Sequence, residues 1–235
     1  MSASASEILA AALQDYGRAV IVGSKSTFGK GTVQRFYNLD QSVNGFQNLK
    51  PLGEVKVTTQ KFYRINGGST QLRGVTPDII LPDGYHYIQI GEKEEDYPME
   101  WTEIPAVPYQ QKVYNLAKLK EIKARSNARV EKSEVFSQVY RIAKRFEQQR
   151  DQTAFPLQLE AYRNLMKERE KASEEFDTLF EKQVNSGVVN LAVDLPGMEG
   201  DESKKTRNDD FINSVSKDVY IRETLFILHD LIALK

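Results

Sequence analysis

The chain has 235 residues, of which 40% are hydrophobic and 28% are charged, with 32 basic side chains against 33 acidic ones. This balance argues against nucleic acid as the main partner, and the absence of cysteine excludes disulfides, thiolate chemistry and cysteine-ligated metals. No run of about 18 apolar residues is free of charges, and the first residues are too few and too polar for a secretory signal.

The first predicted element is a helix over residues 4–16. Its start, "SASE", fits a capping box, in which a serine oxygen accepts from the backbone N–H three residues on and Glu7 reaches back. Good helix formers follow, and Gly17 is a stop signal. A simple helix cap is therefore one interpretation of Ser4.

Residues 18–83 have a sequence pattern that is typical of β-strands. Strands are predicted in "RAVIVG" (18–23), "TVQRFYN" (32–38), "GEVKVTTQKFYRING" (53–67) and "TPDIILPDG" (76–84). The first is a short apolar run bounded by glycine, as in a buried strand, and the next two alternate β-branched or aromatic residues with polar ones. The acidic, proline-containing stretch 91–109 that follows indicates a linker or an irregular crossover.

From about residue 110 the pattern is helical. Apolar residues at steps of three and four predict amphipathic helices around Val135, Val139, Ile142 and Phe146, and around Tyr162, Leu165, Met166, Phe176, Leu179 and Phe180. Residues 197–210 are predicted to be a polar loop, and residues 213–234 a final helix docked against the rest of the domain. No internal repeat is found.

The glycine-rich segment "GSKSTFGKGT" suggests a phosphate-binding loop, but the pattern fails. Five residues separate Gly23 from Gly29, where the motif has four, and Gly31 stands where a magnesium-binding Ser or Thr is required. A strand, not a helix, follows the lysine. Nucleotide binding is therefore disfavoured, and no cofactor or metal site is expected.

The two histidines are far apart in the sequence and show no partner pattern, so a histidine base is not indicated. Lysine is the known alternative in a Ser-Lys dyad. Such a lysine must be neutral to take a proton, so its ordinary pKa of about 10.4 has to fall to about 7–8 through desolvation. Lys30, next to Phe28 and flanked by glycines, fits this role, and a surface lysine in a hairpin turn is the alternative.

Two segments together resemble the carboxyl-terminal processing proteases, the tail-specific peptidases that use a serine–lysine dyad. They are "SASASEILAAALQDYGRAVIVGSKSTFGKGTVQ" and "QKFYRINGGSTQLRGVTPDIILPDG". The resemblance implies Ser4 as nucleophile and Lys30 as base, although "GSKSTFGKG" holds one residue more than the family's usual turn. It also implies that Gln34 holds the lysine amine from the same face of a strand, and that Asp15 has a supporting role.

At the start of a helix, backbone N–H groups point toward a developing oxyanion, and the N–H of Ala5 is the expected donor. The implied fold is α/β, a partial crotonase-like protease core in which a helix packs on a small sheet, followed by a mainly α-helical C-terminal domain. The expected boundaries are 1–83 for the core, 84–109 for the linker and 110–235 for the helical domain. The helical domain resembles that of the family in its length and its helical pattern, more than in motifs.

The family's helical N-terminal part, PDZ domain and first core strands are expected to precede this segment, so the chain is interpreted as the C-terminal portion of a periplasmic endopeptidase of a Gram-negative bacterium, inactive alone. The implied substrates are proteins with apolar C-termini. The resemblance leaves room for peripheral membrane association, and unpaired strand edges predict self-association. The rival hypothesis is a non-catalytic binding or scaffold module that carries a protease remnant.

Overall fold

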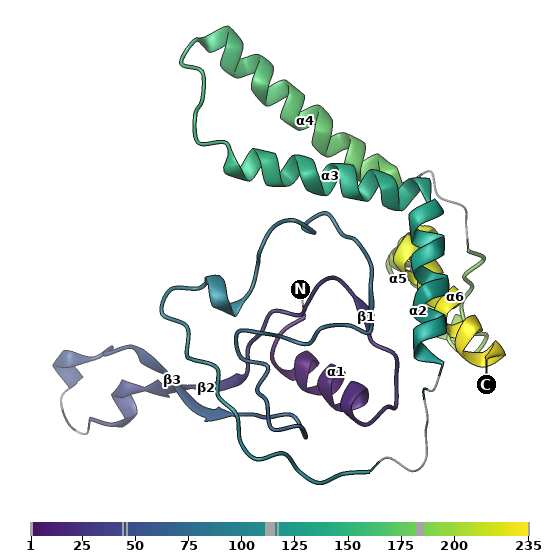
Figure 1. Ribbon diagram of the computed structural model, residues 1–235. Helices are drawn as coiled ribbons and strands as arrows, with labels where there is room; N and C mark the ends of the chain where they lie inside the picture. The colour runs from purple at the N-terminus through teal and green to yellow at the C-terminus, as the bar shows by residue number, and fades with distance from the viewer. Residues whose placement is uncertain are drawn as a thin grey trace. The chain divides into compact units, whose positions relative to one another are not determined.

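The structure is a computed structural model that describes residues 2–43, 45, 47–110, 116, 118–181 and 186–234, without the side chains of residues 175–177 and 179–181. The chain forms two compact units. One unit consists of residues 1–80 and 89–116, and the other of residues 81–88 and 117–235 (Figure 1). An α/β part followed by a mainly helical part confirms the predicted fold class.

In the first unit, helix α1 (Ala5–Asp15) begins and ends as its sequence predicts. At its end Gly17 has φ +58°, its N–H donates to the carbonyl of Gln14, and the N–H of Arg18 donates to that of Leu13 at 2.8 Å. These two bonds are a Schellman motif, for which glycine is preferred because it tolerates positive φ.

The strands form two separate two-stranded pairs. β1 (Val22–Gly23) pairs in parallel with β4 (Ile79–Ile80), and β2 (Thr32–Asn38) pairs antiparallel with β3 (Glu54–Lys61). The β2–β3 hairpin extends away from the rest of its unit (Figure 1). β1 is shorter than predicted because the Asp78 carboxylate accepts the N–H of Ile21 at 2.8 Å, in place of a strand neighbour.

The segment from residue 89 to 110 contains only one short 3-10 turn, Glu92–Glu94, and belongs to the first unit. Hydrogen bonds to other residues of the first unit explain why this segment belongs to it. Gln71 donates to the side chain of Glu92 at 3.2 Å and to the carbonyl of Met99 at 3.1 Å, and the N–H of Glu92 donates to the carbonyl of Phe28.

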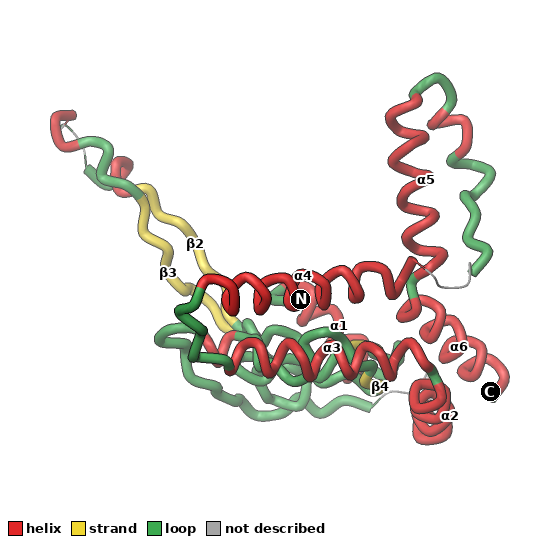
Figure 2. The backbone as a smooth tube through the Cα atoms, turned by 90° about the horizontal axis from the view of Figure 1, so that it is seen from above, coloured by secondary structure: helices red, strands yellow, loops and turns green. Residues whose placement is uncertain are grey.

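The second unit contains α2 (Leu119–Lys132), α3 (Glu134–Asp151), α4 (Leu159–Glu181), α5 (Glu202–Lys217) and α6 (Val219–Ala233). α3 and α4 run side by side (Figure 2). The predicted stripe on α3 is confirmed, since Val139 and Ile142 are buried and Val135 and Phe146 pack on them. The predicted positions Phe176, Leu179 and Phe180 lie outside the described side chains. Within the described part, no helix combines the length and apolarity needed to cross a bilayer.

The sequence prediction for residues 197–234 is wrong in part. Residues 197–210 were predicted to be a polar loop and 213–234 a single helix, but α5 begins at Glu202, and α5 and α6 meet at Asp218. Asp201 caps α5 by accepting the N–H of Lys204 at 3.0 Å, and Asp218 caps α6 by accepting the N–H groups of Tyr220 and Ile221. Aspartate caps supply starts that an apolar periodicity does not reveal.

Candidate active site

Ser4 sits at the head of α1 in an unusual backbone conformation. Its φ is 54° and its ψ is −111°. A positive φ is rare for a residue with a side chain and costs energy, and such residues cluster at functional sites, where the surroundings enforce them. Ser4 therefore lies on a sharp, strained turn into a helix, beside N–H groups that have no intrahelical partner.

Glu7 is the group that enforces this turn. Its side chain is completely buried. Oε2 accepts the backbone N–H of Ser4 at 2.7 Å and that of Lys30 at 2.9 Å. Oε1 accepts the N–H of Gly29 at 2.7 Å and the hydroxyl of Thr27 at 2.5 Å. One carboxylate thus binds the turn that carries the serine to the turn that carries the lysine.

Sequence reasoning identified only the capping-box half of this arrangement. The second half involves consecutive N–H groups of a glycine turn, which form a concave site for an anion. The signal that was missed is "TFGKG" itself: it needs an acceptor for the N–H groups of Gly29 and Lys30. A buried carboxylate that accepts four hydrogen bonds meets that need.

The side-chain nitrogen of Lys30 is held by Gln34, since Nζ donates to Oε1 at 2.9 Å. Gln34 in turn donates to the hydroxyl of Thr58, at a longer distance of 3.4 Å. The sequence predicts that Lys30 and Gln34 lie on the same face of one strand, but the structure places only Gln34 in a strand. Lys30 precedes β2, and the strand register shifts between Val33 and Gln34. The two side chains nevertheless meet, as the hydrogen bond between them shows.

Gly31 permits a close approach of the backbone beside Lys30. A Cβ atom there would lie 2.5 Å from Oγ of Ser69 and 2.6 Å from the backbone nitrogen of Gln71. The N–H of Gly31 donates to Oε1 of Gln71 at 2.8 Å. There is therefore no room for a side chain at residue 31, and glycine is required there.

Asp15 lies at the other end of α1 from Ser4. The guanidinium of Arg64 binds it in a bidentate ion pair, with N–O distances of 2.5 and 2.9 Å, and also donates to Gln14. Bidentate pairs of this kind fix geometry. Asp15 therefore joins the end of α1 to the segment after β3, and among the described residues no hydrogen bond or ion pair joins it to Ser4 or Lys30.

Ala5 is the first residue of α1, so its N–H has no intrahelical acceptor and is suited to bind an oxyanion. Glu7 brings the backbones of Ser4 and Lys30 together, and Gln34 positions the lysine amine. In the part of the chain that the structure describes, no direct hydrogen bond joins the Ser4 hydroxyl to Lys30, and no three side chains gather in a metal-binding cluster.

Two family models match successive parts of the chain. Residues 85–233 match the family described as "C-terminal domain of tail specific protease", and residues 1–81 match peptidase family S41. The "Tail-specific protease" of Haemophilus influenzae is 50% identical over 116 residues, which are 47% of this chain and 15% of that protein.

Two further relatives are more distant. The "Carboxy-terminal-processing protease" of Bartonella bacilliformis is 42% identical over 99 residues, covering 40% of this chain and 20% of the relative. The "Carboxyl-terminal-processing protease" of Picosynechococcus is 40% identical over 81 residues, covering 34% and 17%. The chain therefore matches about a fifth or less of the length of these relatives.

Proposed function

We propose the chemistry of this site from one premise: the chain belongs to the tail-specific proteases of peptidase family S41 and carries their C-terminal domain. In this proposal Ser4 is the nucleophile and Lys30 the general base of a Ser-Lys dyad that hydrolyses peptide bonds. The supporting observation is the strained turn at Ser4, which Glu7 binds to the backbone of Lys30.

The proposed reaction has two stages. Oγ of Ser4 attacks the scissile carbonyl while neutral Nζ of Lys30 takes the hydroxyl proton, and the N–H of Ala5 donates to the oxyanion. Lys30 then gives the proton to the departing amine, which leaves an acyl-enzyme. Water, deprotonated by Lys30, cleaves the ester and restores Ser4. Gln34 keeps Nζ aimed through its hydrogen bond of 2.9 Å.

The proposed substrates are proteins with apolar, unstructured C-termini, which are cleaved at or near those ends. The names of the relatives, "Tail-specific protease" and "Carboxy-terminal-processing protease", support cleavage at or near the C-terminus. We place the activity in the periplasm of a Gram-negative bacterium, by likeness to the family. Because the chain matches only 15% of the Haemophilus relative, the activity is proposed for a protease that includes this segment.

The test is a chimera in which this chain replaces the matching segment of the Haemophilus influenzae tail-specific protease. Its cleavage of an unfolded protein with an apolar C-terminus is measured next to a Ser4→Ala chimera. We expect Ser4→Ala to abolish cleavage, because alanine has no attacking oxygen. The matched control is Ser6→Ala, in the same turn of α1, whose hydroxyl donates to the carbonyl of Ala3. Equal cleavage with and without the Ser4 hydroxyl rules out the proposed nucleophile.

A further inference from the structure

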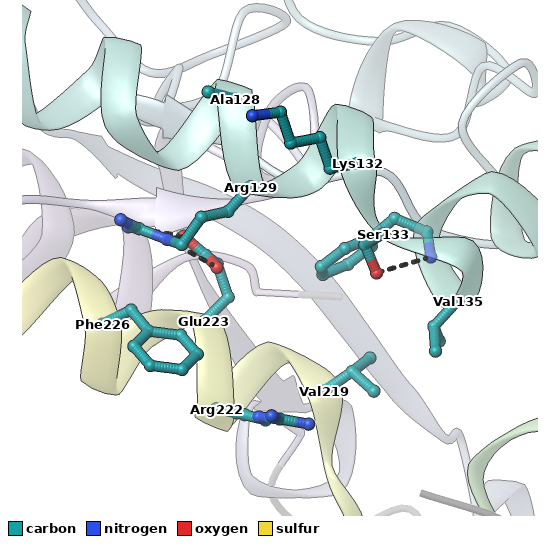
Figure 3. Close-up of a pocket in the computed structure, with 10 residues that line it drawn as sticks. Ala128, Arg129, Lys132, Ser133, Val135, Val219, Arg222, Glu223 and Phe226 are labelled. Carbon is teal, nitrogen blue, oxygen red and sulfur yellow. Dashed lines mark hydrogen bonds and ion pairs between the residues drawn. The ribbon is translucent and has the colours of Figure 1, made fainter.

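The pocket of the helical unit, about 390 Å³ between α2, the start of α3, and α6, is crossed by an ion pair. Figure 3 shows Arg129 of α2 reaching Glu223 of α6, with an N–O distance of 2.9 Å. The other two cations of the lining, Lys132 and Arg222, stand on opposite sides of the pocket. The charged groups of this pocket therefore join two helices and do not converge on one ligand.

One face of the β2–β3 hairpin continues the candidate active site. Gln34, which binds the lysine amine, is opposite Thr58 in the strand register. Phe36, two residues farther along β2, is opposite Lys56. Successive residues of a strand point to alternate faces, so Phe36 shares the face of Gln34, and Arg35 lies on the other face.

Side-chain contacts agree with this register. Gln34 donates to the hydroxyl of Thr58 at 3.4 Å, and Nζ of Lys56 lies 5.6 Å from the ring centroid of Phe36. Phe36 is nevertheless 65% exposed, and Lys56 is exposed as well. The hairpin face that begins at Gln34 therefore continues into an open aromatic ring beside a positive charge.

The chemistry of the dyad decides which part of a substrate lies nearest to this face. In the proposed reaction Lys30 gives its proton to the departing amine, so that amine must lie next to Nζ. Nζ donates to Gln34 at 2.9 Å, which places the departing amine at the active-site end of the hairpin face. The residues that follow the scissile bond begin at this amine, and they are therefore the part of the substrate nearest to β2.

The distance along the strand indicates which of these residues reaches Phe36. A strand advances about 3.3–3.4 Å per residue, so Phe36 lies about 7 Å beyond Gln34, a distance that an extended substrate covers in two residues. We propose that Phe36 and Lys56 form a specificity subsite for the second or third residue after the scissile bond, an inference that rests on the proposed function. The ring packs on an aromatic or aliphatic side chain, and the Lys56 ammonium disfavours a basic one.

The first experiment detects this contact without cleavage, so its outcome does not depend on the dyad. p-Benzoylphenylalanine replaces Phe36 in the Ser4→Ala chain, which is then irradiated with a short peptide of Gly, Ser and Ala that contains one Phe. We expect crosslinks near that Phe, and at least about tenfold fewer when the same label replaces Tyr37, because Tyr37 lies on the opposite face of the hairpin. Equal crosslinking from both positions, or none from position 36, overturns the proposal.

The second experiment locates the subsite along the substrate. The chimera cleaves peptides in which one Phe is moved stepwise away from a fixed Ala-Ala bond, and mass spectrometry identifies the cleaved bond. We expect kcat/KM to be highest with Phe at the second or third position, and Phe36→Ala to lower this maximum about tenfold. A peptide with Gly at that position should be cleaved equally by both, and Tyr37→Ala should leave both peptides unaffected.

Charge reversal tests the contribution of Lys56. At low ionic strength the chimera is expected to cleave a peptide with Asp at the preferred position about two- to fivefold faster than one with Lys. Lys56→Glu should invert this order, because the side chain then repels Asp. Arg35→Glu is the matched control, since this exposed residue lies on the opposite face of the same strand, and it should leave the order unchanged.

The outcomes separate the subsite from the dyad. Cleavage that does not need the Ser4 hydroxyl contradicts the proposed function alone, and crosslinking from position 36 then still supports the contact with substrate. An effect of Phe36→Ala that is equal for the Phe and Gly peptides overturns the subsite, because a merely structural role does not distinguish them. An order of Asp and Lys that Lys56→Glu leaves unchanged overturns it as well. Unchanged circular dichroism and thermal midpoints of the variants establish that specificity, not folding, is compared.

Discussion

The backbone N–H groups of Ser4 and Lys30 donate to the same oxygen atom, Oε2 of Glu7. The distance between the two nitrogens therefore cannot exceed the sum of these two hydrogen-bond lengths. A buried carboxylate thus sets the distance between two turns that are far apart in the sequence, and it does so without occupying either functional side chain.

Glu7→Gln is expected to lower both stability and activity. The amide keeps the size of the side chain but turns one acceptor into a donor, which faces N–H groups or the Thr27 hydroxyl. Loss of charged hydrogen bonds to a buried group predicts a decrease of about 2–3 kcal/mol in the free energy of unfolding. Urea denaturation of the chain measures it, and Glu95→Gln, at an exposed glutamate, serves as the control.

Lys30→Arg is expected to inactivate the chimeric protease as completely as Lys30→Ala. A guanidinium keeps the positive charge but stays protonated at any working pH, so it takes no proton from Ser4. Single-turnover cleavage of an unfolded substrate measures the effect, and Lys25→Arg is the control in the same loop. Substantial activity of Lys30→Arg is incompatible with Lys30 as the general base.

Gln34→Ala is expected to lower kcat more than it changes KM. The side chain holds the Lys30 amine at 2.9 Å and has no proposed contact with substrate. Misplacing a catalytic group costs on the order of 10²-fold in rate. Gln34→Glu keeps an acceptor for Nζ but adds a negative charge that stabilises the protonated lysine, so steady-state kinetics at neutral pH should show no recovery of kcat relative to alanine. Gln60→Ala, on the neighbouring strand, is the control.

Gly31→Ala is expected to disturb the Lys30 turn although it adds a single methyl group. The new Cβ would meet Oγ of Ser69 and the backbone nitrogen of Gln71 at 2.5 and 2.6 Å, and a backbone atom cannot rotate away. Overpacking of this kind costs about 1–3 kcal/mol. Thermal melting measures the loss. Gly197→Ala, where no atom lies within 4 Å of the added Cβ, is expected to be nearly neutral.

Acid is expected to destabilise the helical unit through Asp230. Burial acts to raise the pKa of this carboxyl, but hydrogen bonds from Arg129 and Arg125 outweigh burial and lower it. A lowered folded-state pKa means that the stabilisation is complete above the ordinary aspartate pKa of about 3.9 and is lost as the pH falls below it.

Asp230→Asn therefore has a pH-dependent effect. At neutral pH it should cost about 1–2 kcal/mol, since a charged hydrogen-bond acceptor is lost. The difference from the unsubstituted chain should shrink as the pH falls below about 3.9, because the unfolded chain then takes up a proton more readily than the folded chain does at Asp230. Denaturation curves at several pH values test this, with the exposed Asp210→Asn as control. A difference that stays constant with pH contradicts the assignment.

Much of the first unit could be predicted because its signals are local. The capping box, the Gly17 stop and the alternation in 32–38 each depend on neighbours in the chain, and the structure places α1 and β2 where they were expected. The turn "TFGKG" indicates that an acceptor is needed, but the sequence does not show that this acceptor is Glu7, because Thr27, Gly29 and Lys30 are brought to it only by folding.

In the helical unit, too, the sequence predicted one helix from a local pattern and missed another. The stripe from Val135 to Phe146 predicted α3 because burial follows a period that the sequence displays. α5 was missed because its sequence is charged, and its start depends on the cap at Asp201. The catalytic roles of Ser4, Lys30 and Gln34, and the predicted boundaries 1–83, 84–109 and 110–235, stay predictions until they are tested.

The chain passes from one compact unit to the other three times, because residues 81–88 belong to the helical unit and residues 89–116 return to the first. Residues 81–88 supply Tyr85, whose ring lies 6.2 Å from that of Phe146, and His86, whose ring lies 5.1 Å from that of Tyr140. No single cut yields both units intact. A helical fragment that starts at residue 117 loses these aromatic contacts, so an excised helical unit must also include residues 81–88, joined to residue 117 by a short linker in place of residues 89–116.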